Sequence, residues 1–108
     1  MIGSLRGRLL ERFDPGEVLV EVAGIGYRVE VTPTTAVRLG DTGSEVFLHV
    51  HHHIREVDQT LYGFLERAER ACFETLLSAH GVGPALALSV LGVHGPVELA
   101  RVLADDDL

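Results

Sequence analysis

The residue types with the clearest chemical potential form a short turn, His80-Gly81-Val82-Gly83-Pro84, between two apolar stretches of helical period. A Gly-apolar-Gly turn directs backbone N–H groups outward at the start of the next helix, where they can hold a phosphate without side-chain charge. Glycine at both flanks permits a positive φ and the close approach of a nucleic-acid backbone. The alternative is an ordinary αα-hairpin, in which Gly81 and Gly83 only cap and turn the chain.

Four histidines gather in one short segment and raise the possibility of a metal site. In a strand, His49, His51 and His53 share one face, and His52 points to the other. A metal site needs ligands that converge and carboxylates or cysteines that support them, and only Glu56 is near in sequence. We therefore favour a polar or interface-facing strand over a small metal-dependent enzyme, and we expect no cofactor.

The segment Arg55-Glu56-Val57-Asp58 has the character of a hairpin tip between two strands. The sequence alone favours a solvated turn; the functional alternative is a negative projection that separates nucleic-acid strands. Hydrolase motifs are missing from the sequence, which has no Gly-x-Ser-x-Gly, Walker, Cys-x-x-Cys or His-Glu-x-x-His pattern. Cys72 lies on the apolar side of its expected helix, so we interpret it as a core residue and not as a nucleophile.

Composition narrows the classes of function. The chain has 108 residues, which suits one domain, or one small domain and part of a second. Its net charge of −7 argues, taken alone, against binding a polyanion. A single cysteine excludes an internal disulfide and indicates a reducing, cytoplasmic setting. No apolar run approaches the ~18–20 residues that a membrane-spanning helix needs.

Residues 1–64 have the alternating pattern of β-structure. Turn signals occur at Asp14-Pro15-Gly16 and at Gly24-Ile25-Gly26, and the segment 32–39 suits a short helix that Gly40 ends. Five short strands with one small helical element favour a small closed barrel, with the OB-fold as first candidate. The expected strands lie at residues 2–10, 18–22, 27–31, 46–50 and 60–64.

The hydrophobic period changes to that of a helix at Leu65. Apolar positions then recur at helical spacing as far as Leu77, a second short helix is expected over Pro84–Leu91, and a third begins at Gly95-Pro96. The fold class is therefore α+β: a five-stranded OB-fold β-barrel domain over residues 1–64, followed by an α-helical helix-hairpin-helix segment over residues 65–108.

Four motifs, taken together, resemble the bacterial RuvA family, whose members are the Holliday-junction-binding subunits of the RuvAB branch-migration machine. Each motif is short, but all four fall in the order and spacing of that family and together span nearly the whole chain. They are the start Met1–Gly7, the turn Gly24-Ile25-Gly26-Tyr27, the stretch Ile54-Arg55-Glu56 with Leu61-Tyr62-Gly63-Phe64, and Gly81-Val82-Gly83-Pro84 with Leu86-Ala87-Leu88.

The resemblance implies roles for two groups of residues. Gly81, Val82 and Gly83 correspond to the first helix-hairpin-helix and would offer backbone N–H groups to a phosphate; where the family often has a lysine, this chain has Ala85. The family's acidic pin, two adjacent carboxylates at the junction centre, corresponds to Glu56 and Val57, so only Glu56 matches.

Two further residues near the pin complete the predicted site. Asp58 is one position late, but alternation along a strand would direct it to the same side as Glu56 and so restore a second charge. Arg55 is then expected to contact a neighbouring phosphate. DNA binding is thus predicted at Arg55 and at the glycine turn, with Glu56 and Asp58 as the pin.

The resemblance also implies binding partners and indicates which parts of the family's structure to expect in this chain. RuvA-like proteins form homotetramers that hold a four-way junction open, and they dock the RuvB motor, which hydrolyses ATP, through a small C-terminal domain. Neither that domain nor the second helix-hairpin-helix is present in the sequence, so we expect a non-catalytic N-terminal fragment. The alternative function is an assembly-only module that oligomerises without holding DNA.

Overall fold

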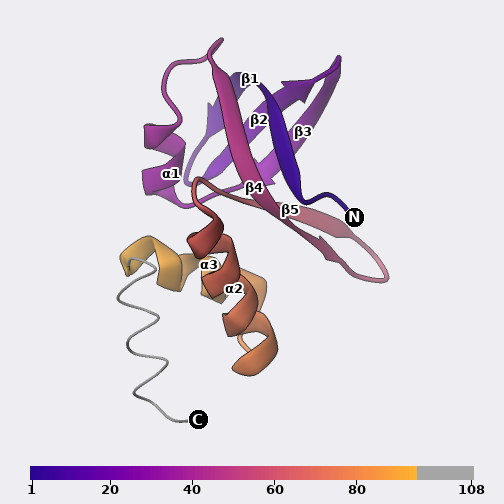
Figure 1. The fold of residues 1–108 in the computed structure, drawn as a ribbon, viewed down its shortest axis with the longest axis vertical. Coiled ribbons are helices and arrows are strands. Elements are labelled where there is room, and N and C mark those ends of the chain that lie inside the picture. The colour runs from indigo at the N-terminus through magenta and orange to yellow at the C-terminus, as the bar shows by residue number, and fades with distance from the viewer. Residues whose placement is uncertain (95–108) are drawn as a thin grey trace.

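The structure is a computed structural model, and it describes residues 1–94. Five strands and a short helix come first, and two longer helices follow, as Figure 1 shows. The elements in order are β1 (Ser4–Phe13), β2 (Glu17–Val22), β3 (Ile25–Glu30), α1 (Pro33–Arg38), β4 (Glu45–Ile54), β5 (Gln59–Phe64), α2 (Arg67–Ala79) and α3 (Pro84–Val93). None of these helices is both long and apolar enough to cross a membrane.

The five strands close into a barrel in the order β1-β2-β3-β5-β4. All neighbouring pairs are antiparallel except β3 and β5, which pair in parallel over two positions. Gly63 of β5 lies where the barrel closes, and a Cβ atom there would fall 2.6 Å from the Val29 side chain. The predicted α+β class and five-stranded OB-fold barrel are confirmed.

Local sequence explains the connections. The short helix expected over 32–39 is α1, which Thr32 caps by accepting a hydrogen bond from the Thr35 N–H at 3.1 Å and in which Pro33 occupies the first turn. The turn between β2 and β3 lies one residue earlier than expected, at Ala23-Gly24, with φ of 51° and 85°. Such a pair suits a type I′ hairpin turn, so Ile25 already belongs to β3.

Alternating apolar residues fill the barrel. The alternation is clearest on β2 and β4, where Val18, Val20, Val46, Leu48 and Val50 are buried and the residues between them are partly exposed. On β5, by contrast, Tyr62, Gly63 and Phe64 are all buried. Because a one-residue shift in register would turn this set outward, the alternation fixes the register of the barrel. The most deeply buried members are Leu9, Val18, Val20, Val29 and Leu48.

A second hydrophobic cluster attaches the helices to the barrel. Tyr62 and Phe64 of β5 pack on Phe73 of α2, with ring centroids 5.1 Å apart in both pairs. Phe73 is fully buried, and Ala87 and Leu91 bring α3 into the same cluster. The position of α2 and α3 therefore depends on two aromatic residues of the last strand.

The helices begin and end close to the predicted positions. The helical period was expected from Leu65, but α2 begins at Arg67 because Glu66 is extended and forms its N-cap, with the Glu66 N–H donating to Glu69 Oε1 at 3.0 Å. Helix α3 continues past the predicted end at Leu91 to Val93. The third helix, predicted from Gly95-Pro96, lies outside the described residues.

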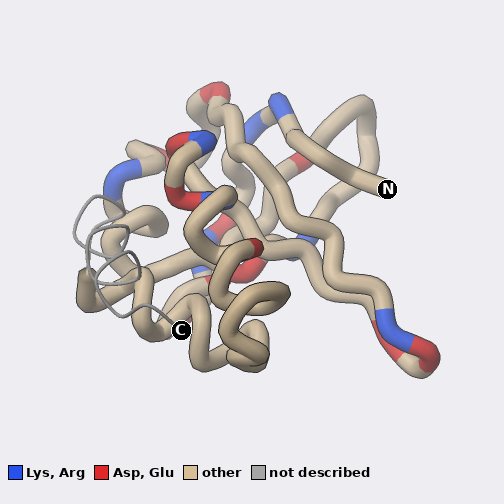
Figure 2. Tube along the Cα trace, turned by 60° about the horizontal axis from the view of Figure 1, so that its bottom comes forward, with Lys and Arg blue, Asp and Glu red and all other residues tan. Residues whose placement is uncertain are grey.

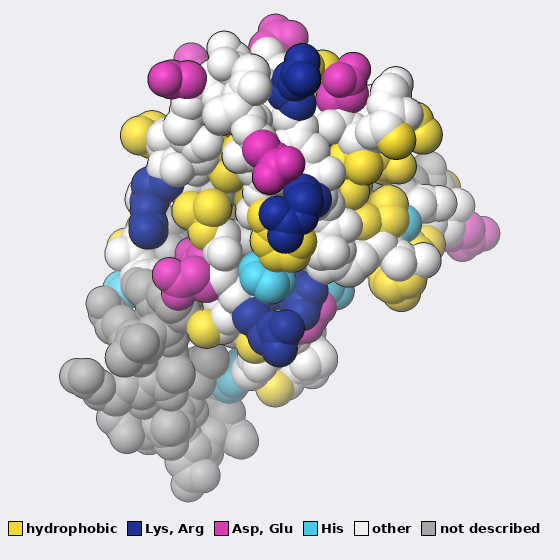
Figure 3. Space-filling view, turned by 45° about the horizontal axis from the view of Figure 1, so that its top comes forward, with side chains coloured by type: hydrophobic (Ala, Val, Ile, Leu, Met, Phe, Trp, Pro, Cys, Tyr) yellow, Lys and Arg dark blue, Asp and Glu magenta, His cyan; other side chains and the backbone are white. Residues whose placement is uncertain are grey.

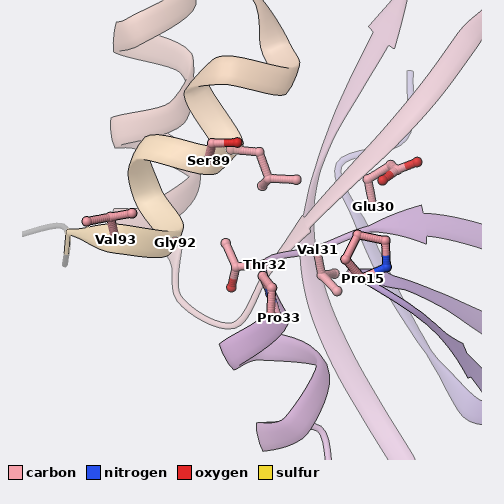
Figure 4. Close-up of a pocket in the computed structure, with 10 residues that line it drawn as sticks. Pro15, Glu30, Val31, Thr32, Pro33, Ser89, Gly92 and Val93 are labelled. Atoms are coloured by element: carbon pink, nitrogen blue, oxygen red, sulfur yellow. The ribbon is translucent and has the colours of Figure 1, made fainter.

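A groove of about 440 Å³ runs between α3 and the barrel (Figure 4). Val31, Thr32 and Pro33, where β3 leads into α1, line one side of the groove, and Leu88 and Gly92 of α3 line the other. The groove lies where the helices cross the end of β3, and it contains none of the predicted site residues.

Candidate nucleic-acid interface

The β4–β5 hairpin carries the first candidate contact at its tip. The two strands pair as far as Ile54 and Gln59, which leaves residues 55–58 as the connecting turn. The Arg55 N–H donates to the Asp58 carbonyl at 2.8 Å and closes the turn. Figure 1 shows this hairpin extending beyond the barrel, so the tip is presented away from the rest of the molecule.

An ion pair spans the tip. Arg55 Nε donates to one carboxylate oxygen of Asp58 at 3.0 Å, and Arg55 Nη2 donates to the other at 2.7 Å. These hydrogen bonds, and then the opposite charge, raise the pKa of Arg55; the same hydrogen bonds lower the pKa of Asp58. The two charges therefore largely cancel each other. Glu56 is the acidic residue of the tip that lies outside this pair.

The tip thus differs from the predicted pin in one respect. The expectation that strand alternation places Asp58 beside Glu56 does not apply, because residues 55–58 form a turn and not a strand. Asp58 instead holds Arg55, which is the predicted phosphate contact. Val57, which the resemblance aligns with the second carboxylate of the expected pin, is 86% exposed.

The α2–α3 turn is the second candidate contact. Gly81 follows α2 with φ of +64°, and Gly83 caps α3 with φ of −68°. Glycine permits a positive φ at both flanks, and the turn adopts one at Gly81 only. Pro84 occupies the first turn of α3, as predicted.

The middle residue of this turn, Val82, forms its contacts within the chain. The Val82 N–H donates to the Leu76 carbonyl at 3.0 Å, which satisfies one of the last carbonyls of α2. The Val82 side chain is partly buried against the helical cluster, as a plug between the helices would be. Within the described residues its amide is thus already paired, whereas the amides of Gly81 and Gly83 donate no hydrogen bond.

The space around Gly83 is open, and the packing of the chain does not explain why glycine stands there. A Cβ atom at this position would meet nothing within 4 Å, and its φ is one that any residue adopts. Folding therefore does not require glycine here, whereas close approach by another molecule would. The turn can offer an anion the Gly83 N–H and the unpaired N–H groups in the first turn of α3.

The two candidate contacts differ in charge. Figure 2 shows basic and acidic positions at the hairpin tip, whereas the α2–α3 turn has no Lys, Arg, Asp or Glu. On the face in Figure 3, arginine and acidic side chains are interspersed. Several arginines have internal partners: Arg28 pairs with Glu17 at 2.8 Å, and Arg70 donates to the Gly3 carbonyl at 2.8 Å. Contact with a polyanion would therefore depend more on backbone N–H groups than on a basic surface.

The histidines follow the predicted alternation and contact protein groups. His51 Nδ1 lies 2.8 Å from Glu74 Oε2, and its ring packs on Phe73 of α2. His52, on the other face, accepts a hydrogen bond from the Ile2 N–H at 3.1 Å. Among residues 1–94, no three His, Cys, Asp or Glu side chains converge as a metal site would require.

Cys72 lies in the helical cluster. It is a free, buried thiol, and burial raises its pKa. A raised pKa reduces the thiolate fraction at neutral pH, so these surroundings do not activate a nucleophile.

Residues 1–63 match the RuvA N terminal domain family, which covers more than half of the chain. The chain belongs to the RuvA family. Three curated relatives carry the name Holliday junction branch migration complex subunit RuvA. The one from Halorhodospira halophila is 50% identical over 108 residues, covering 99% of this chain and 52% of the relative. Those from Salinibacter ruber and Aliivibrio fischeri are 45% and 41% identical and cover 99% and 100% of this chain.

The chain spans about half the length of these RuvA relatives. The family match covers the barrel, and the longer alignments extend over both candidate contacts. The sequence prediction missed one feature of the interface, the Arg55–Asp58 pair. Its signal was available, since opposite charges stand three residues apart at the two ends of a four-residue turn.

Proposed function

We propose that this chain binds four-way DNA junctions as part of a RuvA-type subunit in recombination and DNA repair. The single observation that carries the proposal is the α2–α3 turn, where Gly83 leaves space for close approach and its N–H has no partner among the described residues. This arrangement can hold a phosphate despite a net charge of −7. Membership in the RuvA family supports a junction as the target.

The grip is exerted by backbone groups of the turn. Gly81 reverses the chain, Val82 anchors the turn against the helical cluster, and Gly83 with the first turn of α3 binds the phosphate. The residue after Pro84 is Ala85, so no lysine reinforces this contact. We expect the phosphate to lie beside Gly83, where a side chain would otherwise stand.

The hairpin tip acts at the centre of the junction. Glu56 carries the charge that repels phosphates, and Asp58 contributes a second carboxylate that Arg55 partly neutralises. Arg55 reaches a phosphate only when it is released from Asp58. The tip and the α2–α3 turn both extend toward the lower half of Figure 1, away from the upper loops of the barrel.

The chain itself has no catalytic role in this proposal. ATP hydrolysis belongs to a RuvB-type motor, which we expect to dock through the part of the RuvA length that this chain does not cover. Four copies would form a homotetramer around one junction in the cytoplasm. The name of the relatives, a subunit of a branch migration complex, supports a partner protein of this kind, and the motor, the homotetramer and the location remain part of the proposal.

A competition gel shift tests the proposal. The chain is titrated onto a labelled four-way junction, with unlabelled linear duplex of equal length as competitor, and light scattering gives its oligomeric state. We expect the junction to remain bound when the duplex is in excess. An oligomer that shifts no junction would instead support the assembly-only alternative, and equal competition by the duplex would refute junction selectivity.

A further inference from the structure

The apex of the β4–β5 hairpin combines an exposed apolar residue with a single free charge. Arg55 and Asp58 bind each other through two hydrogen bonds, at 3.0 and 2.7 Å, and a backbone hydrogen bond at 2.8 Å closes the turn between them. Val57 is 86% exposed, and Ile54 at the end of β4 is 51% exposed. The Arg55–Asp58 contacts thus hold the two ends of the turn together, and Val57 is exposed at its tip.

The charges at the apex determine what can contact Val57. The tip has a net charge of −1, because Glu56 adds a carboxylate that is unpaired among the described residues. A phosphate is repelled by this carboxylate, whereas an uncharged, flat apolar surface gains from covering the valine. The face of a base pair is such a surface. It is covered in continuous duplex and accessible only where the stack is interrupted.

We propose that Val57 is an apolar wedge that packs on the exposed face of the last base pair of a duplex arm at a branch point. Arg55 and Asp58 are positioning residues that hold the wedge, and Glu56 keeps phosphates away from it. This inference rests on the proposed function. It changes the role of Asp58 from a second repelling carboxylate to a support for the tip, and the role of Arg55 from a phosphate contact to the partner of Asp58 in that support.

The test uses a four-way junction with 2-aminopurine at the branch point, since this base fluoresces more strongly when it is unstacked. Junction affinity and fluorescence are recorded in the same titration for the wild type and for Val57→Ser. The matched control is Val37→Ser, because Val37 is also highly exposed, at 75%, but lies on α1, away from the tip (Figure 1). We expect both variants to bind the junction. Only Val57→Ser should lose most of the fluorescence increase.

The outcomes separate this inference from the proposed function. Junction binding with an undiminished fluorescence increase in Val57→Ser would overturn the wedge alone. Failure of the wild type to bind any junction would overturn the proposed function, and the wedge with it. A change in oligomeric state in Val57→Ser, without a change in fluorescence, would assign Val57 to a protein contact and overturn the wedge.

The positioning role has its own readout. Asp58→Asn removes the charge of the pair, so we expect a smaller fluorescence increase at saturating protein with an unchanged thermal melting curve. Asp58→Glu keeps the charge, so its fluorescence increase should be larger than that of Asp58→Asn and close to that of the wild type. Equal fluorescence in Asp58→Asn and the wild type would overturn the positioning role.

Discussion

Two turns of this molecule are candidates for contact with DNA, and they are held in opposite ways. The β4–β5 tip is closed by an exposed ion pair between Arg55 and Asp58. The α2–α3 turn contains no Lys, Arg, Asp or Glu and is held by the Val82–Leu76 backbone hydrogen bond and by the burial of Val82. The first turn needs only its two strands, whereas the second also needs both helices to stay packed on the barrel.

This difference assigns the two turns different tasks. A turn built from backbone groups and apolar contacts keeps its geometry as salt and pH change, which suits a grip on phosphate. A turn built from an exposed ion pair is weakened by salt and by acid, because surface pairs are screened and contribute little to stability. The tip is therefore suited to steering and positioning, and the helical turn to holding.

The largest effect is expected from Phe73→Ala. Phe73 is fully buried between α2 and the aromatic residues of β5, and truncating such a residue costs about 3–5 kcal/mol. We expect a large loss of unfolding free energy in urea and loss of junction binding, because α2 and α3 no longer hold their turn in place. Phe47→Ala is the control: it lies on the same barrel but outside this cluster, and should cost much less. Equal losses in both variants would contradict the assigned role of the cluster.

The next largest effect is expected from Gly83→Asp. The carboxylate opposes a bound phosphate and fills the open space, so junction affinity should fall more than tenfold, equivalent to ~1.4 kcal/mol or more. Folding should not suffer, because aspartate is a good N-cap for α3. Gly81→Asp should also weaken binding.

The control for charge is Gly83→Asn, which has the same size and capping ability. It should lose less affinity than the aspartate variant in the same gel-shift assay, with a similar melting temperature. Unchanged affinity in Gly83→Asp would remove the phosphate contact from this turn.

A smaller effect is expected from Gly81→Ala. Its φ of +64° is strained for a residue with a Cβ atom, so the substitution should cost about 1–2 kcal/mol of unfolding free energy. Asparagine tolerates this conformation better, and Gly81→Asn should therefore cost less than the alanine variant. Urea unfolding of the two variants measures the difference, and a stability equal to that of the wild type in Gly81→Ala would show that the conformation is not required.

The smallest effect concerns the pH dependence of the tip. The pKa of Asp58 is lowered in the folded chain, so the pair with Arg55 is complete above the ordinary pKa of aspartate and is lost as the pH falls through the lowered value. The change in overall stability should be slight because the pair is exposed. An NMR titration of the Asp58 carboxyl carbon should show a pKa that rises in Arg55→Gln. An identical pKa in the two proteins would contradict the pairing.

Most of the barrel could be predicted from the sequence, because alternation fixes which residues face inward and the turn residues mark the strand ends. The start of α2 differs from the sequence prediction for a physical reason. Leu65 fits the helical period, but its side chain packs against the barrel core and not with the helical cluster. Hydrophobic periodicity indicates that a residue is buried, but it does not identify the residues against which its side chain packs.

The candidate site could be predicted only in part. Residue types identified the glycine turn and the hairpin tip, but the pairing of individual groups depends on three-dimensional geometry. The Val82 amide is taken by Leu76, and Asp58 is taken by Arg55, because a turn brings together groups that strand alternation would separate. Conversely, the open space at Gly83 became visible only from the distances around it.

The most direct test of the division between a charged tip and an uncharged grip is the salt dependence of junction affinity. The dissociation constant for a four-way junction is measured at several salt concentrations and plotted on logarithmic axes. Each phosphate neutralised by a cationic side chain contributes about 0.9 to the slope. A grip made by backbone N–H groups predicts a shallow slope, equivalent to about one or two neutralised phosphates. A steep slope, equivalent to roughly five or more, would show that arginine side chains hold the DNA and would contradict the account.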